Sequence, residues 1–282
     1  MGKNSMSRVI HMTTPTFIRN SFFFFFNMKF KTTPYHHDLL KDEDRLSAFF
    51  QAIGEYDGNS DLAYDLGCGS GILSYFLKDY FKEIIAVEIN RKASECAKDN
   101  LDAFDNIEVV NSDVLQYEFT KKADLIVCEM LDTALIDEEE VPVLNHARGF
   151  LKEDGKIIPQ GIINTVELVN MQRDNIHWDE GAVYEEFSKP VVYSEFNFLD
   201  NINPEFETSF TLKSKRDGII NGLKITTFTK LNDNIIAGPS PMLNPPLLIP
   251  LEEKSVKVND LINVNLKYIM GNGIESIQAQ YY

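Results

Sequence analysis

The sequence predicts an α/β fold, in which a doubly wound, mostly parallel sheet is followed by an antiparallel β-barrel-like domain. Between residues 36 and 160, short apolar runs alternate with helical stretches, a pattern typical of parallel strands joined by crossover helices. After Pro159 the hydrophobic period changes to two, which is typical of antiparallel strands with one buried face. We therefore divide the chain into residues 1–30, 31–160 and 161–282.

Each element of the first domain follows from its own stretch of sequence. A helix is expected over residues 36–53, where Leu39, Leu46 and Phe49 recur at helical spacing. Apolar runs bounded by turn or acidic residues predict strands at residues 62–66, 84–89, 107–110, 125–128 and 156–158. Helices are expected between them, at residues 71–81, 91–103 and 138–151.

The second domain is expected to consist of strands that alternate in polarity, at residues 162–169, 206–212 and 262–268. Five of the 11 prolines fall between Pro239 and Pro250. Because proline cannot donate a ladder hydrogen bond, we predict an extended loop there and no ladder strand.

Composition and charge limit the classes of function. Of the 282 residues, 44% are apolar and 25% charged, which is ordinary globular usage. The 43 acidic residues against 27 basic ones give a net charge of −16, which argues against nucleic-acid binding and favours a basic protein or peptide partner. The three cysteines lie far apart and form no disulfide framework, which fits a reducing, cytoplasmic location, and we predict no metal site.

Residues 1–30 stand apart from both domains. The run from Phe22 to Phe26 is too short for a membrane span of about 20 residues, so no membrane association is expected. No small-residue cleavage site follows it, as a signal peptide would require. We interpret the segment as a poorly ordered extension, or as sequence upstream of a true start at Met28.

A glycine-rich turn is the most informative stretch of the sequence. It follows the first predicted strand and opens a helix, as Asp65-Leu66-Gly67-Cys68-Gly69-Ser70-Gly71. Glycine has no Cβ, so such a turn lets backbone N–H groups approach a ligand closely. A dinucleotide fingerprint needs a third glycine where Ile72 or Ser74 stands, which argues against NAD. The turn instead resembles the cofactor loop of the class I S-adenosylmethionine-dependent methyltransferases, whose fold is Rossmann-like.

This resemblance implies further cofactor-binding residues. Glu88, at the end of the next strand, stands where a carboxylate accepts both ribose hydroxyls, and Asp113 stands where this fold usually contacts adenine. Arg45 ends a segment that resembles the helix whose arginine binds the methionine carboxylate. The predicted site for S-adenosyl-L-methionine therefore consists of Arg45, Asp65, Gly67, Gly69, Gly71, Glu88 and Asp113.

Two glutamates after the fourth predicted strand indicate which group accepts the methyl. Glu129 and Glu138, with Asp132-Thr133 between them, resemble the two-glutamate loop of the protein arginine methyltransferases. Two carboxylates can hold a planar guanidinium bidentately and leave one nitrogen facing the methyl donor. Alternatively, Glu138 only decorates a helix N-terminus, where acidic residues favour the helix dipole. The Pro-Pro-aromatic motif of methyltransferases that act on the amino groups of bases is absent here.

The resemblance covers most of residues 36–282. His177-Trp178 and Val183-Tyr184 resemble the arm through which family members dimerise, so we expect a homodimer through residues 172–204. Two family features are missing: a Thr-His-Trp loop, which residues 241–247 do not supply, and a Tyr-Phe-x-x-Tyr helix near residues 30–35.

The sequence thus predicts a methyltransferase that acts on an arginine guanidinium of a protein, with Glu129 and Glu138 as the catalytic clamp. One alternative is a methyltransferase of the same fold that acts on a small-molecule amine or another nucleophile. The other is a non-catalytic scaffold that keeps the cofactor pocket without using it.

Overall fold

The computed structural model describes residues 30–56, 58–179 and 181–282. The expectation for residues 1–30 lies outside them, apart from Phe30. In the described part of the chain, no helix is long and apolar enough to cross a membrane.

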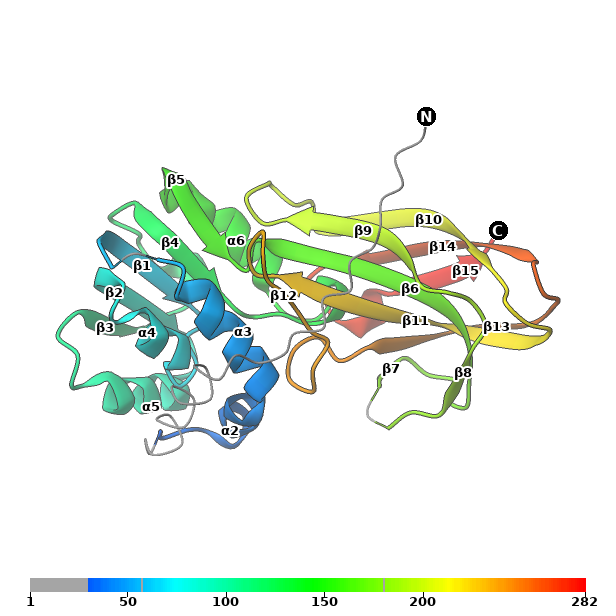
Figure 1. Cartoon of the computed structure of the whole chain (residues 1–282), viewed down its shortest axis with the longest axis horizontal. Coiled ribbons are helices and arrows are strands. Elements are labelled where there is room, and N and C mark those ends of the chain that lie inside the picture. The colour runs from blue at the N-terminus through cyan, green and yellow to red at the C-terminus, as the bar shows by residue number, and fades with distance from the viewer. Residues whose placement is uncertain (1–29, 57, 180) are drawn as a thin grey trace. The chain divides into compact units, whose positions relative to one another are not determined.

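The first half is built on a parallel sheet of five strands in the order β3-β2-β1-β4-β5, which confirms the predicted doubly wound sheet (Figure 1). Its strands are β1 (Ser60–Leu66), β2 (Phe81–Glu88), β3 (Ile107–Asn111), β4 (Ala123–Cys128) and β5 (Leu151–Ile158). Because the strand order reverses between β1 and β4, their carboxyl ends form the crevice where open α/β sheets bind ligands.

Helices cover both faces of this sheet. They are α4 (Ile72–Leu77), α5 (Arg91–Leu101) and α6 (Glu140–Ala147), with short 3-10 turns η1 (Val114–Gln116), η2 (Thr133–Leu135) and η3 (Arg148–Phe150). Ala86 packs with Leu101 of α5, whereas its neighbour Val87 belongs to the cluster that contains Leu144 of α6. Since successive strand residues point to opposite faces, α5 and α6 lie on opposite sides of the sheet.

The helix expected over residues 36–53 is two helices, α2 (Pro34–Lys41) and α3 (Glu43–Ile53), which are separated at Asp42. The Asp42 carboxylate caps α3 by accepting the Arg45 N–H at 3.1 Å. It also accepts the Ser240 hydroxyl at 2.6 Å and the Met242 N–H at 2.9 Å. The break therefore depends partly on a loop two hundred residues away, which helical spacing does not reveal.

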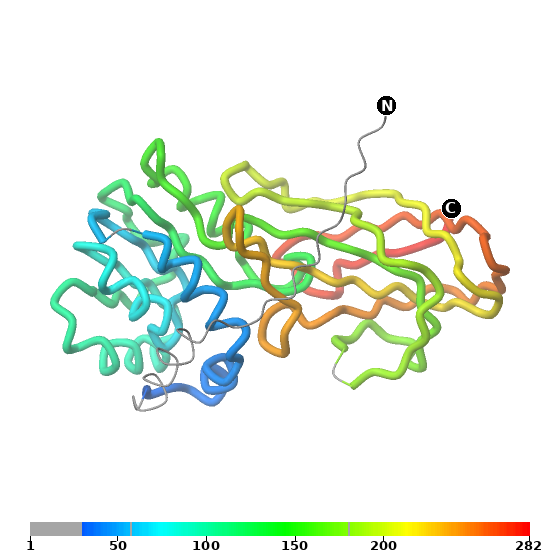
Figure 2. The backbone as a smooth tube through the Cα atoms, viewed as in Figure 1, coloured from blue at the N-terminus to red at the C-terminus, as the bar shows by residue number. Residues whose placement is uncertain are grey.

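The second half is antiparallel, as predicted, and the chain enters it directly from β5 (Figure 2). One sheet has the order β7-β13-β11-β6-β8, with β9 paired to β6 and β12 paired to β11, and the other has the order β10-β14-β15. The bounds are β6 (Gly161–Met171), β7 (His177–Trp178), β8 (Tyr184–Glu186), β9 (Val191–Asn197), β10 (Glu205–Lys213), β11 (Gly218–Lys230), β12 (Ile236–Ala237), β13 (Leu247–Val256), β14 (Leu261–Ile269), η4 (Ile274–Ser276) and β15 (Gln278–Tyr281).

The extended loop predicted as far as Pro250 is shorter than expected. Strand β13 already begins at Leu247, so the prediction is wrong for residues 247–250. Pro250 lies opposite Gly222, next to a register shift between Ile220 and Gly222. Such an irregularity is where a strand tolerates a residue without an N–H.

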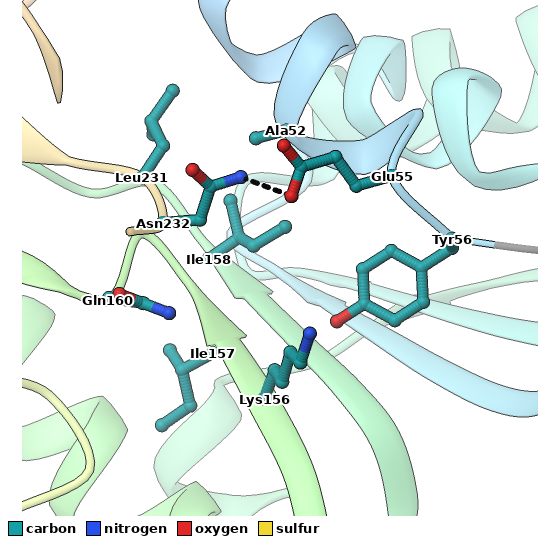
Figure 3. A pocket seen from close by; sticks show the side chains of 9 residues that line it. All are labelled: Ala52, Glu55, Tyr56, Lys156, Ile157, Ile158, Gln160, Leu231 and Asn232. Carbon is teal, nitrogen blue, oxygen red and sulfur yellow. Dashed lines mark hydrogen bonds between the residues drawn. The ribbon is translucent and has the colours of Figure 1, made fainter. Parts of the chain in front are cut away.

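The two halves contact each other at the end of α3. A cavity of about 40 Å³ lies there, between α3, β5 and the loop that joins β11 to β12 (Figure 3). Asn232 Nδ2 of that loop donates a hydrogen bond to Glu55 Oε2 at 2.9 Å. Lys156 of β5 points toward Tyr56, with its Nζ 5.7 Å from the ring centre. The Asn232–Glu55 hydrogen bond therefore joins the two halves here, and the Lys156–Tyr56 contact lies within the first half.

Candidate functional site

A cavity of about 220 Å³ is lined by α2, α3, the glycine turn, the end of β2 and the loop after β4. It brings together six of the sequence-predicted site residues, namely Arg45, Gly67, Gly69, Glu88, Glu129 and Glu138. Asp65, Gly71 and Asp113 do not line it. The two glutamates and most of the predicted cofactor residues therefore share one space.

The glycine turn approaches its neighbours more closely than any other residue type allows. Gly67 and Gly69 have φ values of +74° and +55°, which favour glycine. A Cβ on Gly69 would lie 2.5 Å from Cδ2 of His36, and one on Gly67 would lie 2.8 Å from Cγ of Met130. The turn is therefore packed between α2 and the loop after β4, with its backbone facing the cavity.

The Glu88 carboxylate is held in one orientation at the cavity wall. Its Oε2 accepts the Gly69 N–H at 2.9 Å, and its Oε1 accepts the Asn90 N–H at 2.6 Å. An ionised carboxylate offers about four acceptor positions, so these two bonds leave capacity for a ligand.

Three predicted residues support the site from behind or lie outside it. Asp65 is buried and accepts the Ser74 hydroxyl at 2.5 Å, and burial raises the pKa of its carboxyl to about 6. Gly71 is the N-cap residue of α4. Strand β3 ends at Asn111, and Asp113 caps η1 by accepting the Leu115 N–H at 2.9 Å.

Arg45 and Glu129 form a buried ion pair between Nη2 and Oε2. The Arg45 side chain is 4% exposed, and its Nε and Nη1 have no hydrogen-bond partner. Burial raises the pKa of Glu129, and the Arg45 guanidinium opposes this rise. Because unpaired buried donors are costly, these two nitrogens would suit an anionic group bound in the cavity.

We call residues 129–138 the acidic loop. Glu138 reaches the cavity from an exposed position at the far end of this loop. Partial desolvation, followed by the charges of Asp137 and Glu129, raises the pKa of Glu138. The Asp132 carboxylate folds the loop back by accepting the N–H groups of Ile136, Asp137 and Glu138 at 3.0–3.3 Å.

Other residues at the site were not predicted from the sequence. The ring of half-buried His36 lies against Gly69, and its Nδ1 is 2.6 Å from the Thr33 hydroxyl. Burial lowers the pKa of His36. Thr33 followed by Pro34 is a helix-start signal that would have indicated a turn of helix there. Met242 lines the cavity from the second domain, and no local sequence pattern predicts this.

Comparison with known proteins identifies a domain within this chain. An archaeal protein of Methanothermobacter thermautotrophicus, described as uncharacterized, is 46% identical over 252 residues, which cover 89% of this chain and 99% of that protein. Residues 63–155 match the family described as the methyltransferase domain. The chain therefore contains a methyltransferase domain. This methyltransferase is also 33% identical over 132 residues to a "probable protein arginine N-methyltransferase 6.1" of Oryza sativa subsp. indica, across 44% of this chain and 34% of that one.

Among solved structures, the methyltransferase shares its fold with the "Trypanosoma brucei PRMT1 enzyme-prozyme heterotetrameric complex with AdoHcy". The TM-score is 0.72 at 17% identity, over 83% of this chain and 87% of that one. The two-domain layout of the protein arginine methyltransferases is thereby confirmed for this chain.

The methyl donor of class I methyltransferases is S-adenosylmethionine, and the cavity fits it. The unpaired donors of Arg45 suit a carboxylate, the fixed Glu88 carboxylate suits neighbouring hydroxyls, and the glycine turn forms part of the cavity wall. Glu88, Glu129 and Glu138 outnumber Arg45 among the charged residues lining the cavity, which favours a cation at the sulfur.

Proposed function

We propose that this methyltransferase transfers a methyl group from S-adenosylmethionine to an arginine guanidinium of a protein. One observation carries the proposal: Glu129 and Glu138, from opposite ends of the acidic loop, line the same cavity as Arg45 and Glu88. A carboxylate pair in the cofactor cavity suits a cationic, planar acceptor better than a neutral amine.

Different residues of the cavity would bind different groups of the cofactor. Arg45 would bind the methionine carboxylate through Nε and Nη1, and Glu88 would accept the ribose hydroxyls. When bound, the cofactor supplies an electrophilic methyl group on a positively charged sulfur. We keep Asp65 and Gly71 in supporting roles behind the turn, and Asp113 stays a predicted adenine contact.

The two glutamates would hold the acceptor and accept its proton. Glu129 shares its carboxylate with Arg45, so it offers the more rigid half of the clamp. Glu138 lies at the exposed rim, and its raised pKa suits a carboxylate that takes a proton from the attacking nitrogen and passes it to solvent. Positioning would supply most of the rate, because the methyl group itself needs no further activation by the protein.

Glu138→Gln tests this proposal, with Glu139→Gln as the matched control on an exposed neighbour. We expect Glu138→Gln to lower radiolabelled methyl transfer onto arginine peptides by about 100-fold or more, with cofactor affinity nearly unchanged. Glu139→Gln should stay near the parent. Glu129→Gln should also abolish transfer, but it additionally removes the partner of Arg45 and so is expected to change cofactor affinity as well.

The same assay separates the alternatives. Transfer to lysine peptides or small amines, and never to arginine, would show that the methyl acceptor is another nucleophile. Tight cofactor binding with no transfer to any acceptor would favour the scaffold. Parental activity in Glu138→Gln would remove Glu138 from the clamp.

A further inference from the structure

The middle of the acidic loop is strained. Ala134 and Leu135 have φ values of +61° and +62°, a left-handed conformation that residues with a Cβ rarely adopt. Both side chains are fully buried. Two such residues in succession persist only when the surrounding structure imposes the conformation, and strain of this kind gathers at functional sites.

The surrounding structure here is the second domain. Four consecutive residues of the acidic loop each form one hydrogen bond with it. The bonds are Thr133 Oγ1 to Pro245 O at 2.6 Å, Ala134 N–H to Thr227 Oγ1 at 2.8 Å, Gly271 N–H to Leu135 O at 3.0 Å and Gly273 N–H to Ile136 O at 2.9 Å. The loop that carries both glutamates is therefore shaped by the antiparallel half of the chain.

Thr227 is the one partner among these four that uses a side chain. It is fully buried on β11, and its hydroxyl donates to Asn164 Oδ1 at 2.6 Å. Asn164 Nδ2 in turn donates to the Ser194 hydroxyl at 2.9 Å. Because the single hydroxyl proton goes to Asn164, a lone pair of Thr227 faces the Ala134 N–H.

We propose that Thr227 is a positioning residue of the methyl-transfer site, because its hydroxyl holds the strained turn that places Glu138 relative to Glu129. The first end of the acidic loop is fixed by the Arg45–Glu129 pair, and the second end is folded back by Asp132. The turn at Ala134 joins these two ends, so its conformation sets their separation. This inference rests on the proposed function, since it assigns a purpose to the spacing of the two glutamates.

Thr227→Val is the test, because valine keeps the shape and removes the hydroxyl. We expect kcat for methyl transfer to fall about tenfold or more, as misplaced catalytic groups do. The KM for S-adenosylmethionine should change little, because Thr227 does not line the cavity. Thr227→Ser, which keeps the hydroxyl, should restore kcat. Thr165→Val is the matched control, since Thr165 lies on neighbouring β6 and donates to Thr226 O at 3.2 Å.

Amide hydrogen exchange of residues 133–138 gives a readout that needs no acceptor. It should be faster in Thr227→Val than in the parent or in Thr165→Val. If the parent methylates no arginine peptide, the proposed function fails, and this measurement alone decides the role of Thr227. Parental kcat in a folded Thr227→Val, unchanged exchange, or equal impairment in Thr227→Ser would each overturn the proposal.

Ala134→Gly supplies a second test of the strained turn. Glycine adopts the left-handed conformation without strain, so the turn should depend less on the hydroxyl. In that background we expect the loss of kcat caused by Thr227→Val to become smaller. An equal loss in both backgrounds would overturn the role assigned to the strained turn.

Discussion

Four of the six acidic side chains between residues 129 and 140 have different environments and therefore different roles. Glu129 and Glu138 line the cavity, whereas Asp132 and Glu140 are buried and bind backbone N–H groups. Glu140 Oε2 accepts the Met130 N–H at 2.9 Å, next to Glu129. Burial, opposed by that hydrogen bond, raises the pKa of Glu140 to about 8. Near neutral pH, Glu140 is thus a neutral structural group.

This state of Glu140 predicts how stability depends on pH. In the unfolded chain its carboxyl titrates near 4.5, and in the folded chain near 8. Between these values the folded chain binds more protons, so the free energy of unfolding falls as pH rises through the window and levels off above it. Asp132 and Asp65, whose pKa values are raised to about 7 and about 6, act in the same direction.

Glu140→Gln should remove the contribution of this group, since glutamine stays neutral in both states and keeps the acceptor for Met130. The parent should lose about 3 to 4 kcal/mol of its free energy of unfolding through this group between pH 5 and pH 8, and the variant should not. Urea unfolding at both pH values measures this difference, with exposed Glu139→Gln as the control. Parallel pH profiles for parent and variant would show that Glu140 does not titrate in this window.

At the residue scale, the sequence predicts best where the chemistry is local. The glycine turn, Glu88 and the two glutamates were found from neighbours in sequence, and the structure brings them into one cavity. Thr227 and Met242 were missed because their partners lie on distant segments. The strain at Ala134 was missed because alanine favours no left-handed turn.

At the scale of elements, the positions of the strands could be predicted from the sequence, but the boundaries of the helices and loops could not. Period-two alternation located β10 and β14 because only one face of each strand is buried. It also located β6, although both faces of that strand are buried between Val166 and Val169. The break between α2 and α3 was missed because Asp42 is held by Ser240 and Met242.

The segment that contains β7 and β8 is the element on which the predicted homodimer depends. Lys224 anchors it to the sheet, because its Nζ lies 3.2 Å from Glu167 Oε1 and 4.9 Å from the centre of the Tyr184 ring. Within residues 172–204, Val183 and Val192 are 61% and 62% exposed. Exposed valines in a predicted arm suit an apolar contact with a second copy.

We expect a dimer in sedimentation velocity that Val192→Glu weakens, since it places a charge in the contact. Val258→Glu is the control, because Val258 is 51% exposed outside the predicted interface. A single species at the monomer mass of 32.2 kDa, at tens of micromolar protein, would contradict the arm assignment.

At the scale of the whole molecule, the two halves depend on each other at the site. The second domain shapes the acidic loop. Through Met242 it also binds Asp42, the residue that caps the start of α3, and α3 carries Arg45. The alternation of strands and helices predicted the first half, and the change to a hydrophobic period of two predicted the second. Hydrogen bonds between the two halves leave no periodic signal in the sequence. The net charge of −16 suits a basic acceptor, which the chain would attract over several ångströms and less strongly as salt rises.

The most direct test of the account is to locate the transferred methyl group by fragment-ion mass spectrometry. The parent protein would be incubated with S-adenosylmethionine and a basic peptide that offers one arginine, one lysine and a free amino terminus. We predict a methyl group on a guanidinium nitrogen of the arginine, and none on the peptide in which that arginine is replaced by lysine. Methylation of the lysine or the amino terminus, with the arginine unmodified, would contradict the account.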